Sequence, residues 1–193
     1  VQAVAEIDRE RLSRADQWIL ARLDAAIAEC DAALGPARPT DKHWTLAERT
    51  MGMRLNDYAE TARRFVWNEL ADWYLEAIKG RLAEGGDDRE VARAVLVHAF
   101  DGALRLLHPI VPFVTEALWQ RLPGRGEDEL LIVARWPRAA GGFGDGAAAF
   151  ELVRDTVNAL RQLRGEYNIT PGKQLSAIVV PAPNAPASAR GVA

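Results

Sequence analysis

Five side chains recur at helical spacing along one segment of the sequence, and together they could form a face that contacts RNA. They are Arg64, Asn68, Leu75, Lys79 and Leu82. Cationic side chains neutralise phosphate, an amide reads the edge of a base, and a leucine packs against an unstacked base, as in the recognition of single-stranded loops. The alternative is a solvated helix face on which Leu75 and Leu82 pack against a neighbouring helix.

A second cationic row lies about ninety residues further along, in the segment RQLRGEYNITPGK. It contains Arg161, Arg164 and Lys173, and Arg154 precedes them on the same predicted helix. A helix carrying these residues could approach a nucleic-acid backbone or simply brace the rest of the fold. Acidic neighbours such as Asp155 and Glu166 could neutralise much of the row, because side chains three and four residues apart pair on a helix.

No pattern in the sequence points to a catalytic or metal site. His43, His98 and His108 are not spaced as metal ligands on one helix face, which requires histidines four residues apart. There is no P-loop and no G-x-S-x-G motif. We therefore expect this chain to have no catalytic residue, no bound metal and no cofactor of its own.

The composition restricts the function classes further. The chain has 193 residues, and 24 basic against 27 acidic side chains give a net charge of −3. This balance excludes a general nucleic-acid binder, so any RNA contact must be a local patch. No apolar run approaches the roughly 20 residues of a membrane helix. The single cysteine, Cys30, suits a reducing compartment, and we expect a cytoplasmic protein without membrane contact.

Helices must position these side chains, and the sequence predicts where several of them begin and end. Ser13 and Asp16 start a helix that ends at Gly35. Thr45 and Glu48 offer a second capping box. From about residue 56 to 82 the pattern is helical again.

A further helix with an apolar stripe from Val91 to Leu107 ends at His108 and Pro109, and a new helix begins at Pro112 and continues to Leu122. We expect a core that includes the aromatic residues and prolines of these segments: Trp67, Trp73, Tyr74, Pro109, Pro112, Phe113 and Trp119.

The last third of the sequence changes in composition. Residues 130–136, LLIVARW, are apolar and β-prone, and a Gly-rich linker follows. A helix is predicted over 147–167 and a strand over 175–180. The fold class is therefore mainly α: a helical bundle over 1–137, a linker over 138–146, a helix and strand of a small α/β subdomain over 147–180, and a disordered tail or linker stump over 181–193.

Three motifs together resemble one known family. They are DWYLE-x-x-K at 72–79, LLHPIVPF-x-TE-x-LWQ at 106–120, and R-x-x-R-x-E-x-x-I-x-P-x-K at 161–173. This combination resembles the anticodon-binding helical bundle of class I aminoacyl-tRNA synthetases, and within that class it points to valyl-tRNA synthetase. The resemblance covers about 12–180, nearly the whole chain.

The resemblance implies that binding and catalysis lie in different domains. Such a bundle binds the anticodon arm of valine tRNA, while a catalytic domain elsewhere in the parent chain uses ATP and Mg to attach valine. Motifs resembling HIGH and KMSKS, which bind ATP in that class, are absent here. The family's first bundle helix would precede Val1, and a coiled-coil arm would follow the chain. We expect a monomer whose partners are the tRNA and these two parts of the parent.

The chain departs from the family pattern at a few positions. Leu70 and Ala71 stand where Phe-Cys is more usual before DWYLE, and Ala117 replaces a glutamate; all three changes are conservative for packing. Two alternatives stay open. The first is the same module from an isoleucyl- or leucyl-tRNA synthetase, and the second is a helical scaffold for protein interactions without any RNA role.

Overall fold

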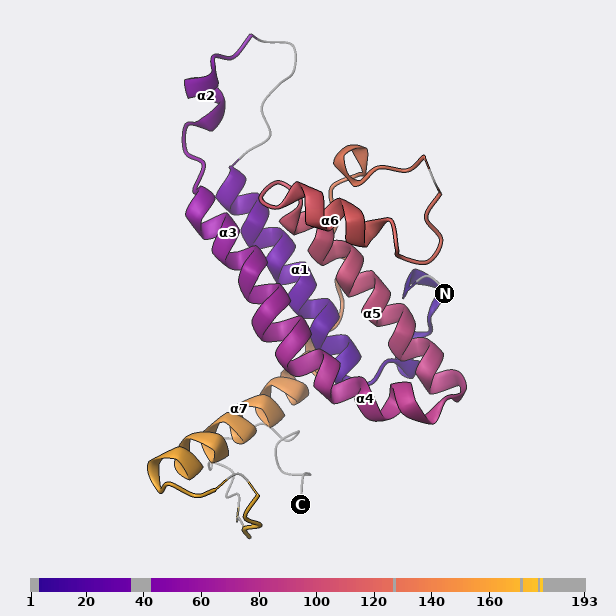
Figure 1. Cartoon of the computed structure of the whole chain (residues 1–193), viewed down its shortest axis with the longest axis vertical. Helices are drawn as coiled ribbons and strands as arrows, with labels where there is room; N and C mark the ends of the chain where they lie inside the picture. Colours follow the sequence, from indigo (N-terminus) through magenta and orange to yellow (C-terminus); the bar gives the residue numbers. More distant parts are fainter. Residues whose placement is uncertain (1–3, 36–42, 127, 171, 177, 179–193) are drawn as a thin grey trace.

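Long helices pack side by side to form a bundle, with a further helix projecting from one end (Figure 1). The computed structural model describes residues 4–35, 43–126, 128–170, 172–176 and 178. The helices in this part are α1 Arg14–Leu34, α2 Leu46–Thr50, α3 Leu55–Arg64, α4 Leu75–Glu84, α5 Gly86–Leu107, α6 Pro112–Trp119 and α7 Gly144–Glu166, with a π-helical segment η3 Phe65–Tyr74 and the 3₁₀ turns η1 Val4–Glu6, η2 Arg9–Arg11 and η4 Leu131–Val133.

Helix α1 forms the centre of the bundle and begins and ends where the sequence predicts. The backbone N–H of Asp16 donates to Ser13 Oγ (3.1 Å) and that of Ser13 donates to Asp16 Oδ2 (2.9 Å), which completes the capping box. At the other end Gly35 has a φ of 79°, a conformation that glycine adopts without strain. The apolar stripe of α1 is buried against α3, η3 and α5.

The second long element runs from Leu55 to Glu84 and combines α3, η3 and α4. The capping box of Thr45 and Glu48 is present, but α2 after it has only five residues. A bend follows at Gly52, whose φ is 83°. Because α3 then continues through η3 into α4 without a break, this element presents one long side to α1 and α5.

The π-helical turns of η3 correct one prediction about the core. Phe65, Leu70 and Tyr74 are buried, and their spacing of five and four residues matches a π-helix, which places more residues in each turn than an α-helix. An α-helical register would bring Trp67 to the same face as Leu70. In the π register Trp67 points outward and is 65% exposed, so its assignment to the core was wrong. Trp73 is half-buried at the edge of the core.

The proline elbow between α5 and α6 is present, with Pro112 in the first turn of α6. Thr115 and Trp119 face inward, and Trp119 forms a small second core with Leu104 and Leu131. Thr115 and Trp119 fill the inward positions of the elbow, so its outward side lies outside the core, contrary to the prediction. Its exposed residues are Pro109, Pro112 and Phe113.

The β-structure expected in the last third is absent from the described residues. Leu131–Val133 forms a 3₁₀ turn against α6, and Ile132 and Val133 are exposed. The described residues provide no neighbouring strand with which this apolar run could pair. Residues 172–176 and 178 form no strand; 177, 179 and 180 lie outside the described residues, as does the predicted tail. The helix of this region, α7, packs its N-terminal part against α1, where Phe150 contacts Trp18.

Candidate nucleic-acid interface

The residues of the first predicted stripe lie along α3, η3 and α4, but they are not equally available to a ligand. Arg64 forms an ion pair with Glu29 of α1, and its Nε lies 3.9 Å from Glu69 Oε1. Lys79 pairs with Glu76 one turn earlier, and both of these side chains are mostly exposed. An exposed pair of this kind contributes at most about 1 kcal/mol, so Lys79 can exchange its partner for a phosphate.

Asn68 and Leu75 differ in exposure. The Asn68 side chain is exposed, and its amide makes no hydrogen bond to any described residue. Leu75 is half-buried at the start of α4. The amide of Asn68 is therefore free to pair with a ligand, whereas Leu75 offers only part of its side chain.

Arg64 belongs to a polar chain that joins α1 to η3. Glu69 is 5% exposed and accepts a hydrogen bond from Arg22 Nη2 at 2.6 Å. This hydrogen bond raises the pKa of Arg22 above its ordinary value. Thr61 Oγ1 donates to Glu29 Oε2 at 3.1 Å, next to the Arg64 ion pair. Within this chain of contacts, Arg64 holds two helices in register.

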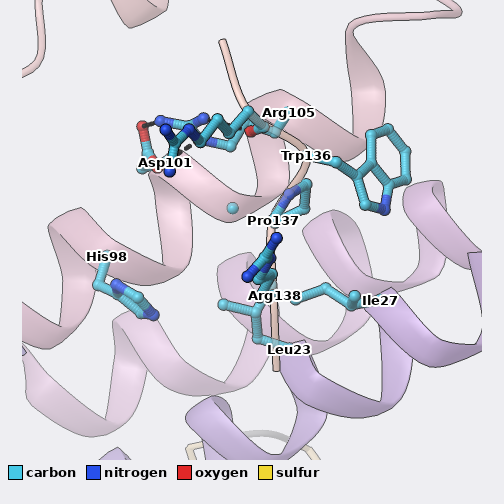
Figure 2. A pocket seen from close by; sticks show the side chains of 10 residues that line it. Leu23, Ile27, His98, Asp101, Arg105, Trp136, Pro137 and Arg138 are labelled. Atoms are coloured by element: carbon cyan, nitrogen blue, oxygen red, sulfur yellow. Dashed lines mark hydrogen bonds and ion pairs between the residues drawn. The ribbon is translucent and has the colours of Figure 1, made fainter. Parts of the chain in front are cut away.

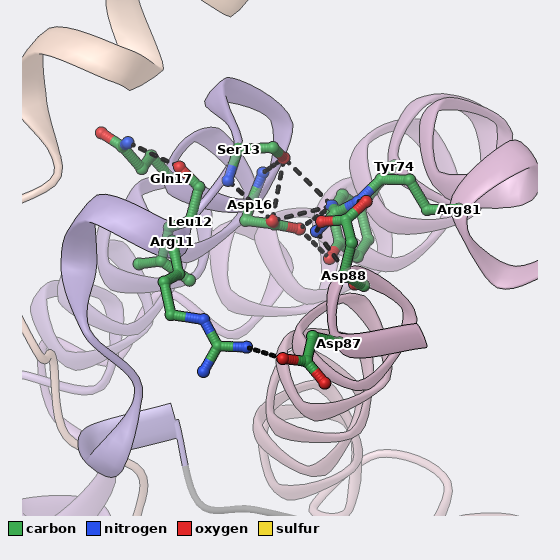
Figure 3. A network of polar contacts seen from close by, with 9 residues as sticks. All are labelled: Arg11, Leu12, Ser13, Asp16, Gln17, Tyr74, Arg81, Asp87 and Asp88. Atoms are coloured by element: carbon green, nitrogen blue, oxygen red, sulfur yellow. Dashed lines mark hydrogen bonds and ion pairs between the residues drawn. The ribbon is translucent and has the colours of Figure 1, made fainter. Parts of the chain in front are cut away.

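A second polar network fixes α4 and α5 onto the N-terminus of α1 (Figure 3). Asp16 is fully buried and accepts hydrogen bonds from Tyr74 Oη (2.6 Å) and Arg81 Nη1 (2.8 and 2.9 Å). Arg81 also donates to Asp88 (2.7 Å), and this contact lowers the pKa of Asp88. Burial raises the pKa of Tyr74, which therefore stays a neutral hydrogen-bond donor. The network sets the position from which α4 presents Lys79.

Two residues of the second predicted row, Arg161 and Arg164, lie on α7, and Arg161 contacts η3. The Arg161 guanidinium carbon lies 5.2 Å from the centroid of the Trp73 ring, a cation–π distance. The Arg154 guanidinium carbon also lies over Trp73, 5.6 Å from a ring centroid, and Arg154 pairs with Glu151 at 3.1 Å. Arg161 is exposed and has no ion pair with a described residue. The structure thus brings α7 and η3, distant in sequence, onto one surface.

The remaining two residues of this row have different surroundings. Arg164 Nη2 donates to the carbonyl oxygens of Thr170 (2.7 Å) and Lys173 (3.0 Å) and so closes the turn after α7. The Lys173 side chain is exposed and forms no ion pair with the described part of the chain. Arg164 holds the backbone that carries Lys173.

Another polar region, which the sequence did not predict, lies where residues 134–143 cross α1 and α5. This strap is fixed by side chains of α1: the indole N–H of Trp136 donates to Asp31 (2.7 Å), and the backbone N–H groups of Ala140 and Gly141 donate to Asp24 (2.9 and 2.7 Å). Each contact links residues more than a hundred positions apart, so no local pattern could have revealed it.

A cavity of about 280 Å³ lies beside the strap, with His98, Asp101 and Arg138 in its lining (Figure 2). Burial lowers the pKa of His98, which keeps the imidazole neutral near pH 7. Asp101 accepts hydrogen bonds from Arg105 Nε and Trp119 Nε1, both at 2.7 Å, so its carboxylate serves to hold the elbow. The cavity lacks a free acid paired with a base, which general acid–base chemistry requires.

The described residues contain neither a cluster of metal ligands nor a helix that could span a membrane. No group of three or more His, Cys, Asp or Glu residues there is arranged to hold a metal ion. None of the described helices is both long and apolar enough to cross a membrane.

The sequence matches one known protein family and several known proteins. The family described as the anticodon-binding domain of tRNA ligase matches residues 46–179, which include α2 to α7. The chain is also similar to the valine–tRNA ligase of Geobacter sulfurreducens, with 42% identity over 171 residues, or 87% of this chain and 18% of that protein.

Other similar proteins carry the same name. The valine–tRNA ligase of Nocardia farcinica is 36% identical over 175 residues, and that of Thermotoga maritima is 34% identical over 176 residues. Each match covers 90% of this chain and 18% of the relative. The chain thus spans less than one fifth of the length of these relatives.

Proposed function

Because this chain belongs to the anticodon-binding domain family of tRNA ligases, we propose that it is the module of a valine–tRNA ligase that recognises the anticodon arm of valine tRNA. The family match over residues 46–179 carries this proposal. The names of the relatives favour valine over isoleucine or leucine. A scaffold without an RNA role would not explain a match to this family.

The proposed RNA surface is the one that η3, α4 and α7 share. Asn68 would read a base edge, because its amide is exposed and unpaired within the described part of the chain. Arg161, Lys173 and Lys79 would neutralise phosphates; the first two have no ion pair to a described residue, and the third has only an exposed one. Leu75 would pack beside an unstacked base.

Arg64 and Arg164 have a different role in this proposal. Their guanidinium groups already bind Glu29 and the backbone of the turn after α7. They would position the helices and the turn that carry the contacting residues, and would not themselves meet the RNA.

The module would select the tRNA and not catalyse a reaction. ATP, Mg and valine would bind a catalytic part of the ligase outside this chain, and correct anticodon binding would place the acceptor end of the tRNA there. We place this monomeric module in the cytoplasm, where it would meet tRNA during translation.

The salt dependence of tRNA binding tests the proposed surface. Each lost phosphate contact should make the slope of log Kobs against log salt concentration less negative by about 0.7 to 0.9. Arg161→Ala and Lys173→Ala should each produce this change, and Arg93→Ala is the matched control, because Arg93 is an exposed arginine on α5 that pairs with Glu90. Equal slopes for Arg161→Ala and Arg93→Ala would refute the assignment of Arg161.

A further inference from the structure

Helix α7 begins directly after the strap, so the end of the strap sets the direction in which the helix leaves the bundle. α7 packs mainly against α1 and projects from one end of the bundle (Figure 1). At about 1.5 Å per residue, Arg161 lies about 25 Å along the axis from the first residue of the helix. A tilt of about 10° at that residue would move Arg161 by about 4 Å, which exceeds the length of a hydrogen bond to a phosphate.

The side chain of Arg9 holds the last residues of the strap. Arg9 Nη1 donates to the carbonyl oxygen of Gly142 at 3.0 Å, and Arg9 Nη2 donates to that of Gly141 at 3.1 Å. The guanidinium carbon also lies 5.0 Å from the centroid of the Phe143 ring, a cation–π distance, and Phe143 is buried. One side chain of η2 therefore contacts the three residues that immediately precede α7.

Asp24 of α1 fixes the same backbone through its other polar groups. Its carboxylate accepts the N–H groups of Ala140 and Gly141 at 2.9 and 2.7 Å. The N–H of Gly141 is thus bound by Asp24, and its carbonyl oxygen is bound by Arg9. Hydrogen bonds depend on angle as well as distance, so this backbone cannot rotate without losing one of the two contacts.

Two glycines make the approach of Arg9 possible. Gly141 and Gly142 have φ angles of 71° and 82°, a conformation that glycine adopts without strain. A Cβ atom at position 142 would lie 2.0 Å from Arg9 Nη1, whereas a Cβ atom at position 141 would have no neighbour within 4 Å. Position 142 therefore requires glycine both for its backbone conformation and for the space that Arg9 occupies.

Apolar contacts also hold the start of α7, but they do not set its angle. Phe150 packs on Trp18 of α1, with ring centroids 5.0 Å apart. Apolar attraction is non-directional, so this contact keeps α7 against α1 while the helix can still pivot. The contact of Arg161 with Trp73 lies further along the helix and depends on the direction in which α7 starts.

We propose that Arg9 is a positioning residue that fixes the direction of α7 and, with it, the places of Arg161 and Lys173 on the RNA surface. This inference rests on the proposed function. Arg9 acts through α7 and does not itself bind a phosphate, because its guanidinium is turned to the strap carbonyl groups and the Phe143 ring.

A distance measurement tests the positioning without any RNA. Spin labels are attached at Ala32→Cys on α1 and Ala159→Cys on α7, both at exposed positions, and pulsed electron paramagnetic resonance gives the distance between them. The native Cys30 is buried and does not take up a label. Arg9→Ala should shift or broaden the distance distribution by about 4 Å. Arg11→Ala is the matched control, because Arg11 lies in the same turn but reaches Asp87 at 4.0 Å.

Gly142→Ala tests the same contact from the strap. It should change the distance as Arg9→Ala does, because the added methyl group displaces the guanidinium. Gly124→Ala is its control, since Gly124 has a φ of 80° but no atom within 4 Å of an added Cβ, and it should leave the distance unchanged. Circular dichroism checks that each variant folds. An unchanged distance in Arg9→Ala would overturn the proposal.

Binding of valine tRNA to the same variants tests the consequence for RNA. Arg9→Ala should weaken binding by about tenfold, the loss of one charge-assisted contact. In the Arg161→Ala background it should weaken binding by less than about threefold, because the contact that it positions is already gone. Arg9→Lys should behave like Arg9→Ala, because a lysine lacks the planar fork that donates to two carbonyl oxygens.

The binding data separate the proposal from a direct RNA contact and from a failure of the proposed function. Wild-type affinity in Arg9→Lys, together with a full additional loss in the Arg161→Ala background, would show that Arg9 itself binds a phosphate and would overturn the proposal. A changed label distance with unchanged tRNA binding in Arg9→Ala and Arg161→Ala would support the positioning of α7 by Arg9 and refute the RNA surface on α7.

Discussion

Replacement of Arg81 by methionine should destabilise the fold far more than loss of a surface arginine. Methionine keeps most of the side-chain volume but removes the charge that faces the fully buried Asp16. A buried carboxylate that loses its ionic partner costs about 3 to 5 kcal/mol. Asp16 would retain hydrogen bonds from Ser13 N–H (2.9 Å), Ser13 Oγ (2.8 Å) and Tyr74 Oη (2.6 Å), which places the expected loss at the low end, about 3 kcal/mol.

The contact between Arg81 and Asp88 adds little to this figure. The Asp88 side chain is 63% exposed, so its pairing is worth at most about 1 kcal/mol. A graded variant is Tyr74→Phe, which removes only one buried hydrogen bond to Asp16 and should cost about 1.5 to 3 kcal/mol. The order of stabilities should therefore be wild type, then Tyr74→Phe, then Arg81→Met.

Urea denaturation followed by circular dichroism measures these differences. With typical slopes of about 1 to 3 kcal/mol/M, a loss of 3 kcal/mol lowers the midpoint by about 1 to 3 M urea. Arg93→Met is the matched control; its exposed pair with Glu90 should contribute less than about 0.5 kcal/mol. If Arg81→Met loses no more stability than Arg93→Met, the network of Asp16 does not hold α4 and α5 onto α1.

Three further predictions follow from burial and register. Burial raises the pKa of Cys30 to about 11, so its thiol should react with a disulfide reagent at pH 8 only after unfolding, and fast reaction of the native protein would contradict its burial. Burial lowers the pKa of His98 below its ordinary 6.5; the charge of Arg105 acts in the same direction, and the charges of Asp101 and Asp24 oppose it. The unfolded state therefore binds more protons below pH 6.5, so the free energy of unfolding should fall as the pH drops from 7 to 5. His98→Asn should reduce this fall in urea melts recorded at each pH. The π register predicts that Trp67→Ala costs less than about 1 kcal/mol while Phe65→Ala costs about 3 to 5 kcal/mol, and equal losses would show an α-helical register instead.

Local signals in the sequence were sufficient to predict much of the bundle. The two capping boxes and the glycine that ends α1 depend on residues within three or four positions of one another, and they form as predicted. The elbow follows from the fixed φ and missing N–H of proline, which act on the chain whatever surrounds it. These features need no knowledge of the tertiary structure.

The errors arose where tertiary packing overrides local preference. The apolar run Leu130–Trp136 has β propensity, yet in the described structure it has no strand to pair with and forms a 3₁₀ turn against α6. An α-helical period predicts Trp67 in the core, whereas the segment is π-helical and leaves Trp67 exposed. No pattern in the sequence distinguishes the two periods over ten residues.

The sequence also does not show which cationic side chains are free to bind RNA. Arg64 is held by a glutamate 35 positions away, and Arg161 lies over a tryptophan from another helix. The family motifs identify the segments that form the surface, but only the pairing in three dimensions separates side chains that are free for RNA from those that hold the helices together.

Titration of this chain with three tRNAs at low and moderate salt tests the central claim most directly. The tRNAs are valine tRNA, the same tRNA with an altered anticodon, and isoleucine tRNA. The proposed function predicts salt-sensitive binding that is tightest for the unaltered valine tRNA. Equal affinity for all three, or no binding to any, would contradict the account of this chain as an anticodon-recognition module.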